Sequence, residues 1–155
     1  MVILVTNQEQ ANLDWNTLMF ECMILGDSIA VGVAMHRKEC VAYAKVGWNS
    51  WQWNKDYLSS ATTKSYETII ISLGANDHRG VKTEQELRKM RESIKGKKVF
   101  WIDAGKTRKP IPHEAMIKIA TEYGDTILDR PTNHMSPDGV HPTGRGYKIL
   151  AGQTK

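Results

Sequence analysis

The chain has 155 residues, the length of one ordinary domain. Hydrophobic residues make up 41% and charged residues 25%, which excludes a disordered tail, a collagen-like repeat and a coiled coil. The formal net charge of +4 is mild, the basic clusters are short and no nucleic-acid-binding motif occurs, so we expect no nucleic-acid partner.

Residues 1–20 do not fit a regular pattern, and we expect them to form either an extra edge strand or a poorly ordered segment. The chain starts without a basic stretch, and its apolar run at residues 2–5 is short. Such a start predicts neither a secretory signal nor a membrane span. The sequence therefore predicts a protein that is cytoplasmic as synthesised, and it makes no prediction of oligomeric state.

From residue 21 onward, strand-like apolar stretches alternate with helical patterns. Strands are predicted at 21–26, 40–46, 68–73, 99–103 and 126–128. Helices are predicted at 28–36, 51–58, 84–94, 114–123 and 144–151. This alternation predicts one α/β domain over 1–155, with a parallel five-stranded sheet and helices on both faces. In such sheets, functional residues lie in the loops that follow the strands.

The first loop of interest is Gly26-Asp27-Ser28, which follows the first strand and opens the first helix. A serine there has an exposed hydroxyl, and its backbone N–H lies at a helix N-terminus that favours a developing anion. The same residues also suit a plain helix cap, since Asp and Ser are common at helix starts.

Two further loops carry polar residues at equivalent places. Asn76, in Gly74-Ala75-Asn76-Asp77, follows the central strand and either faces Ser28 or forms an Asx turn. Asp138 precedes His141 by three residues, a spacing that lets the carboxylate contact one imidazole nitrogen and leaves the other for a serine hydroxyl. The alternative for this third loop is a polar turn before the last helix.

Taken together, these motifs resemble those of the SGNH hydrolase (GDSL-type esterase/lipase) superfamily over residues 21–152. Ile29 replaces the leucine of the GDSL motif, at a position that should only pack. The matching stretches are Gly26-Asp27-Ser28, Gly47 within Val46-Gly47-Trp48, Gly74-Ala75-Asn76-Asp77, and Asp138-Gly139-Val140-His141-Pro142-Thr143 followed by Gly146-Tyr147.

The resemblance implies a three-layer α/β/α sandwich similar to flavodoxin, and it implies roles for individual residues. Ser28 would be the nucleophile, His141 the general base and acid, and Asp138 the residue that orients His141. The oxyanion hole would comprise the N–H groups of Ser28 and Gly47 and the side-chain amide of Asn76. No metal or cofactor is expected, because serine hydrolysis by this route uses none.

Other residues near these motifs have two interpretations each. His78 and His134 either line the pocket or are ordinary surface or hydrogen-bonded histidines. The tryptophans that follow Gly47 either shape a substrate pocket, Trp48 foremost, or belong to the core; the other two are Trp51 and Trp53. His36 and His113 lie at helix ends and need no functional role, and Cys22 and Cys40 are predicted to be buried free thiols.

The sequence predicts a serine esterase that acts on small esters through an acyl-enzyme at Ser28. The favoured substrate is an acetyl ester on a carbohydrate, because the short chain leaves no room for a lid or a long acyl tunnel. The alternatives are a lipolytic esterase or thioesterase of longer acyl chains, and a non-catalytic binding or structural domain with the same fold. An enzyme of this kind acting on cell wall would leave the cell by lysis or in a phage particle.

Overall fold

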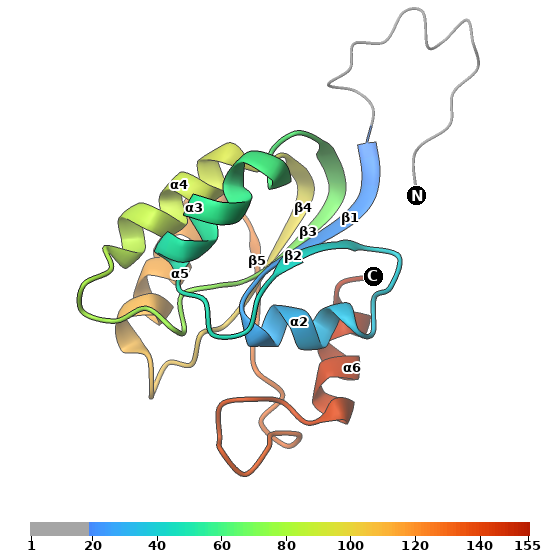
Figure 1. Ribbon diagram of the computed structural model, residues 1–155. Helices are drawn as coiled ribbons and strands as arrows, with labels where there is room; N and C mark the ends of the chain where they lie inside the picture. The colour runs from blue at the N-terminus through green and yellow to red at the C-terminus, as the bar shows by residue number, and fades with distance from the viewer. Residues whose placement is uncertain (1–18) are drawn as a thin grey trace, which may run out of the picture.

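A five-stranded parallel sheet forms the centre of the fold. The structure is a computed structural model that describes residues 19–155 (Figure 1). Its strands are β1 (Met19–Gly26), β2 (Val41–Ala44), β3 (Ser65–Ser72), β4 (Gly96–Ile102) and β5 (Thr126–Leu128). They are ordered β2-β1-β3-β4-β5, and every neighbouring pair is parallel. The predicted five-stranded α/β sheet is confirmed.

Helices cover both faces of the sheet. Helices α2 (Ser28–Ala34) and α6 (Gly144–Gln153) pack together on one face. Helices α3 (Ser50–Ala61), α4 (Thr83–Ser93) and α5 (Pro110–Tyr123) lie side by side on the other, which completes the three layers (Figure 1). No helix within residues 19–155 combines the length and apolar composition needed to cross a membrane.

The core has two parts because successive side chains of a strand point to opposite faces of the sheet. In β3, Ile69 and Ile71 pack toward the larger helical layer together with Trp53 and Trp101. Ile70 packs on the other face, against α2 and α6, and Ile29 joins it there as a buried residue. Ile29 therefore fills the packing role predicted for it.

Several element boundaries differ from those expected. Helix α5 begins at Pro110 rather than at residue 114, because proline is tolerated in the first helical turn. Helix α3 begins at Ser50 because Asn49 and Gln52 form a capping box. Residues 19 and 20 extend β1, which lies inside the sheet and not at its edge. The rest of the predicted extra N-terminal segment lies outside the described residues.

The prediction of free thiols is wrong, because Cys22 and Cys40 form a disulfide bond. The register of the sheet explains why they meet. Strands β1 and β2 are parallel neighbours in which Met23 pairs with Val41, so the residues just before these two also lie side by side. The Cα atoms of the two cysteines are 4.7 Å apart, within the range for a disulfide.

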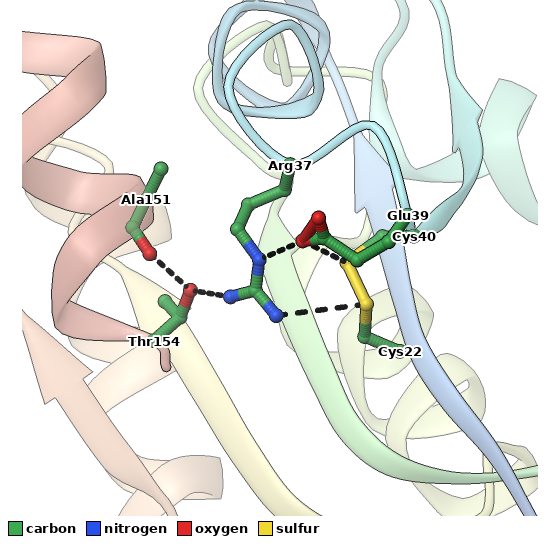
Figure 2. The surroundings of a disulfide bond; sticks show 6 residues. All are labelled: Cys22, Arg37, Glu39, Cys40, Ala151 and Thr154. Atoms are coloured by element: carbon green, nitrogen blue, oxygen red, sulfur yellow. Dashed lines mark hydrogen bonds and ion pairs between the residues drawn. A yellow bond between two sulfur atoms is a disulfide. The ribbon is translucent and has the colours of Figure 1, made fainter. Parts of the chain in front are cut away.

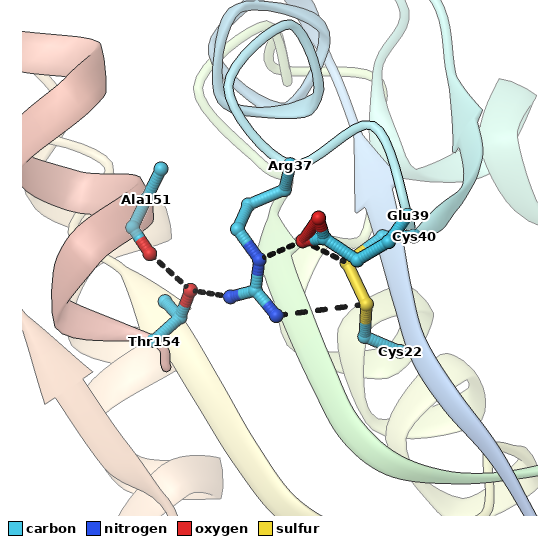
Figure 3. Close-up of polar contacts among 6 residues, drawn as sticks. All are labelled: Cys22, Arg37, Glu39, Cys40, Ala151 and Thr154. Carbon is cyan, nitrogen blue, oxygen red and sulfur yellow. Dashed lines mark hydrogen bonds and ion pairs between the residues drawn. A yellow bond between two sulfur atoms is a disulfide. The ribbon is translucent and has the colours of Figure 1, made fainter. Parts of the chain in front are cut away.

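A buried arginine accompanies this disulfide (Figure 2). The guanidinium of Arg37 donates hydrogen bonds to Glu39 and to the hydroxyl of Thr154, and its Nη2 lies 3.6 Å from the Cys22 Sγ atom (Figure 3). Thr154 follows the end of α6, and its hydroxyl in turn donates to the Ala151 carbonyl. The arginine thus joins the loop before β2 to the C-terminal helix.

Candidate active site

Ser28 lies at the carboxyl end of β1, where a tight turn leads directly into α2. Gly26 has a φ of 136°, and a Cβ at this position would lie 1.7 Å from the Ser72 carbonyl oxygen, so only glycine fits. Asp27 caps the helix by accepting a hydrogen bond from the Ile29 N–H at 3.1 Å. Ser28 is therefore the first residue of the helix, as the sequence predicted.

Ser28, His141 and Asp138 form a chain of hydrogen bonds. The Ser28 Oγ atom lies 2.8 Å from His141 Nε2, and His141 Nδ1 lies 2.8 Å from Asp138 Oδ2. The serine and the histidine are 113 residues apart in sequence, so the contact depends on the tertiary fold. The structure brings together the three residues predicted as the catalytic group.

The loop that carries His141 is held by its own hydrogen bonds. Asp138 Oδ1 accepts from the backbone N–H groups of Val140 and His141, at 2.8 and 2.9 Å. The hydrogen bond with the His141 side chain, and after it these two backbone bonds, hold the pKa of Asp138 well below its ordinary value. Asp138 is therefore a stable anion beside the imidazole, and Gly139, with a φ of 67°, makes the turn between them.

The expected oxyanion hole comprises three hydrogen-bond donors: the N–H groups of Ser28 and Gly47 and the side-chain amide of Asn76. These donors follow the ends of β1, β2 and β3, which are adjacent strands. Neither the Ser28 N–H nor the Gly47 N–H has an acceptor within residues 19–155. The side-chain amide of Asn76 donates to the Trp48 carbonyl at 3.1 Å, which links the loops after β2 and β3. Its second N–H has no acceptor among the described residues.

Asp77 strengthens the link between these loops, a role that sequence reasoning did not assign. Its two carboxylate oxygens accept from the Ser50 N–H at 2.7 Å and from the Ser50 hydroxyl at 2.6 Å. Ser50 begins α3, so this pair fixes the loop that carries Asn76 to the start of a helix. The sequence shows Ser50 beside Asn49, a residue type that caps helices, but only the fold identifies Asp77 as the partner of Ser50.

Arg130 is a second residue that sequence reasoning missed. Its guanidinium donates to three backbone carbonyls: Asp103 at 2.9 Å, Ala104 at 2.7 Å and Val140 at 2.6 Å. Because Val140 precedes His141, the arginine ties the histidine loop to the end of β4. An isolated Arg after the last strand carries no sequence signal for this role.

Asp27 is fully buried beside the candidate nucleophile. It accepts hydrogen bonds from Ile29 and from the Ser72 hydroxyl, but its Oδ2 has no hydrogen-bond partner among residues 19–155. Burial raises the pKa of Asp27 to about 6, an effect that these hydrogen bonds and nearby Arg130 partly oppose. The helix cap is therefore also a titratable group directly behind Ser28.

The two predicted pocket residues have different surroundings. His78 is exposed and lines a hollow of about 480 Å³ together with Trp51. Trp48 is half-buried, stacks on Tyr57 with ring centres 5.2 Å apart, and does not line that hollow. A substrate contact by either residue stays a prediction. Trp53 belongs to the core, where its indole N–H donates to a backbone carbonyl.

The remaining histidines either form hydrogen bonds within the fold or are exposed to solvent. His113 Nδ1 is 2.7 Å from Asp103 Oδ1, in the first turn of α5. The His134 carbonyl accepts from the N–H and the hydroxyl of Thr143 and so braces the start of α6. His36 is exposed just after α2.

One group of potential metal ligands exists within residues 19–155. It consists of Cys22, Glu39 and Cys40, whose ligand atoms lie within 4.8 Å of one another. The two sulfurs are bonded to each other, so they are not thiolate ligands in this state. This group therefore contributes no metal chemistry to the site.

Several solved structures resemble this chain in fold, and their names include an acylhydrolase, a GDSL-like lipase and an acetyltransferase domain. A lipase/acylhydrolase from Enterococcus faecalis has a TM-score of 0.63 and 17% identity, covering 86% of this chain and 92% of its own. A GDSL-like lipase from Bacteroides thetaiotaomicron has a TM-score of 0.56 and 18% identity, covering 94% and 91%. The C-terminal catalytic domain of peptidoglycan O-acetyltransferase A from Streptococcus pneumoniae has a TM-score of 0.56 and 18% identity, covering 86% and 89%.

No protein-family model and no curated protein matches the sequence. At these identities, the structural likeness defines the fold. The chain has the fold of the SGNH (GDSL-type) hydrolases, as its motifs predicted.

Proposed function

We propose that the protein is a serine esterase that works through an acyl-enzyme at Ser28. The observation that carries the proposal is the hydrogen-bond chain from Ser28 Oγ through His141 to Asp138, with both distances 2.8 Å. This geometry supplies a nucleophile, a base within reach of its proton and an anion that orients the base.

The proposed reaction has two halves. His141 takes the hydroxyl proton as Ser28 Oγ bonds to the acyl carbon, and it then gives that proton to the departing alcohol. The N–H groups of Ser28 and Gly47 and the Asn76 amide stabilise the oxyanion of each tetrahedral intermediate. In the second half, water gives a proton to His141 as its oxygen bonds to the acyl carbon. The bond between that carbon and Ser28 Oγ then breaks, His141 returns the proton to Oγ, and the acid leaves.

We propose a small acyl group, acetyl foremost, carried by a carbohydrate. The side chains of His141 and Asp138 are 40% and 50% exposed, so the site is open rather than enclosed as an acyl tunnel would be. One structural neighbour is a peptidoglycan O-acetyltransferase domain, a protein whose name links this fold to acetyl esters of a glycan. Longer acyl chains and thioesters are the alternative substrates.

The place of action also enters the proposal. Disulfides persist mainly in oxidising environments, and Cys22 and Cys40 form one here. We propose that the enzyme acts on its ester outside the reducing cytoplasm, which agrees with release by lysis or carriage in a phage particle.

The proposal is tested by replacing the nucleophile. We expect Ser28→Ala to reduce p-nitrophenyl acetate turnover by about 10⁴-fold or more and to abolish labelling by a fluorophosphonate probe. Ser59→Ala, which changes an exposed serine of α3, is the matched control and should behave as wild type. Retention of more than about a tenth of the activity in Ser28→Ala would contradict the proposal, and absence of both activities in wild type would favour a non-catalytic domain.

A further inference from the structure

A second hollow, of about 390 Å³, lies between the loop after β3 and the loop after β4. Arg79 comes from the first of these loops, and Arg108 and Lys109 come from the second. Segments far apart in sequence therefore bring three cationic side chains to one concave surface at the carboxyl edge of the sheet. The two loops are neighbours at that edge in Figure 1.

These three cations have no ion-pair partner within the described part of the chain, residues 19–155. None of their side chains has a hydrogen bond within that part of the chain either. Asp77 is the carboxylate among the residues that line the hollow, and both its oxygens are occupied by Ser50. Asp77 keeps its negative charge, but three cations face this one carboxylate, so the lining is net positive, which favours the binding of an anion.

Arg108 also lines an adjacent hollow of about 530 Å³. The other charged residues of that hollow either have partners in the protein or balance one another in charge. There Asp103 contacts His113, and Arg130 donates to three carbonyls. Lys106 and Asp129 are the remaining charges of that hollow and oppose each other in sign. Arg108 is thus the free guanidinium shared by the two hollows.

Both sides of the cationic hollow adjoin the candidate active site. Asp77 and His78, which line it, directly follow Asn76. On the other side, the Arg108 guanidinium is packed against Gly139, where a Cβ would lie 3.1 Å from its Nη2 atom. Gly139 directly follows Asp138, so an anion bound on the side of Arg108 that faces the hollow, away from the Asp138 carboxylate, would still lie near the serine–histidine–aspartate group.

We propose that this hollow binds an anionic group of the ester substrate, a carboxylate or phosphate borne by the glycan that carries the acetyl group. The inference rests on the proposed esterase function and adds the charge of its substrate. Arginine suits this role, because its planar guanidinium donates two parallel hydrogen bonds to a carboxylate or phosphate. The hollow then places an acidic residue of the glycan while the neighbouring acetyl ester reaches Ser28.

Three acetylated glycans test the proposal: neutral xylan, galacturonan with carboxylates, and a phosphomannan with phosphodiesters. We expect kcat/KM for acetate release from at least one anionic polymer to exceed that from xylan by about tenfold, and to fall at high salt. The anionic polymer that is preferred identifies the group. Equal rates on all three polymers, or rates that do not respond to salt, would overturn the proposal.

Variants of the cationic residues test whether the preference for anionic over neutral polymers arises from this hollow. In Arg79→Gln/Arg108→Gln, the ratio of anionic to neutral kcat/KM should fall to near one, and Arg108→Lys should keep part of it because the charge remains. Lys98→Gln removes a charge at the amino end of β4, at the opposite edge of the sheet, and should leave the ratio at the wild-type value. A loss in Lys98→Gln as large as in the double variant would show a general charge effect and overturn the proposal.

A binding measurement separates this inference from the esterase proposal. In Ser28→Ala, deacetylated galacturonan or phosphomannan should bind more tightly than deacetylated xylan, and Arg79→Gln/Arg108→Gln should remove the difference. If wild type hydrolyses no ester but the binding preference is present, the esterase proposal fails and the anion site stands. If esters are hydrolysed but the variant binds all polymers alike, the anion site fails alone.

Discussion

The buried carboxylate of Asp27 sets the electrostatics immediately behind Ser28. Its pKa of about 6 means that the folded protein holds this proton far more tightly than the unfolded chain does. The charged form is disfavoured because the side chain is buried away from water and one of its oxygens has no hydrogen-bond partner in the part of the chain that the structure describes. Asp27 supplies the hydrogen-bond acceptor that caps α2, but at neutral pH its carboxylate is ionised while buried, and this lowers the stability of the fold.

Asp27→Asn replaces this carboxylate by an amide that does not titrate, so the difference in free energy of unfolding between wild type and variant should depend on pH. As the pH rises from 3.8 to about 6, unfolding releases the Asp27 proton, so wild-type stability falls. Relative to Asp27→Asn, the free energy of unfolding should fall by about 1.4 kcal/mol per pH unit in this window and stay level above it. Urea unfolding of both proteins across pH 4 to 8 measures the difference. A difference that is constant with pH would contradict the raised pKa.

Arg130 holds the His141 loop without contacting the substrate in the proposed reaction. In Arg130→Lys the charge remains but the three-way hydrogen bonding is lost. We expect kcat to fall on the order of 10- to 100-fold with little change in KM, because His141 loses its alignment with Ser28. Steady-state kinetics measure both constants.

The control for this arginine is Arg88→Lys, which changes an exposed pair with Glu122 and should leave both constants unchanged. If Arg130→Lys raised KM alone, the arginine would instead be a substrate-binding group.

At the scale of single elements, the short edge strand β2 depends on the disulfide. It has four residues and, among the strands of residues 19–155, pairs with β1 alone; Gly47 of the proposed oxyanion hole follows it. The Cys22–Cys40 bond closes a segment that contains α2 and its connection to β2, with a sequence separation of 18. This bond therefore supports the strand that positions Gly47.

Removing the disulfide should lower the stability measurably. For a closed loop of this length, we expect Cys22→Ala/Cys40→Ala to lower the free energy of unfolding by about 3 kcal/mol. Guanidinium unfolding of wild type with and without a reductant gives the same comparison on one chain. The double variant is the control, because the reductant should not change its stability. Equal stability of wild type and variant would show that the bond contributes nothing.

The elements themselves were largely predictable, while their partners were not. The β-branched run at 68–73 predicted the central strand β3. The helix predicted over 114–123 does end at Tyr123, and Gly124 follows it in the left-handed conformation. These signals are local. The disulfide, the Arg130 contacts and the Asp77–Ser50 pair connect residues brought together only by strand order and register, which one sequence does not specify.

At the scale of the whole molecule, one edge of the sheet carries the candidate site. Ser28, Asn76 and His141 were predictable as a group because each follows a strand or precedes a helix, and a parallel sheet collects such loops at its carboxyl edge. The hollow with Arg79 and Arg108 was not predictable, since surface cations carry no periodic signal. Its walls arise from two loops whose shapes depend on the helices that follow them.

The openness of this edge predicts which acyl chains are preferred. An acyl tunnel would bury each added methylene, and each would then contribute about 0.8 kcal/mol to the transition state. Here the site is open, with His141 40% exposed, so carbons beyond the first few remain in water and gain nothing. We expect kcat/KM on p-nitrophenyl esters to be highest for acetyl or butyryl and low for octanoyl. The Ser28→Ala variant, assayed on the same series, corrects for spontaneous hydrolysis. If kcat/KM instead climbed steadily to octanoyl and beyond, the short-ester proposal would be wrong and a lipolytic function would replace it.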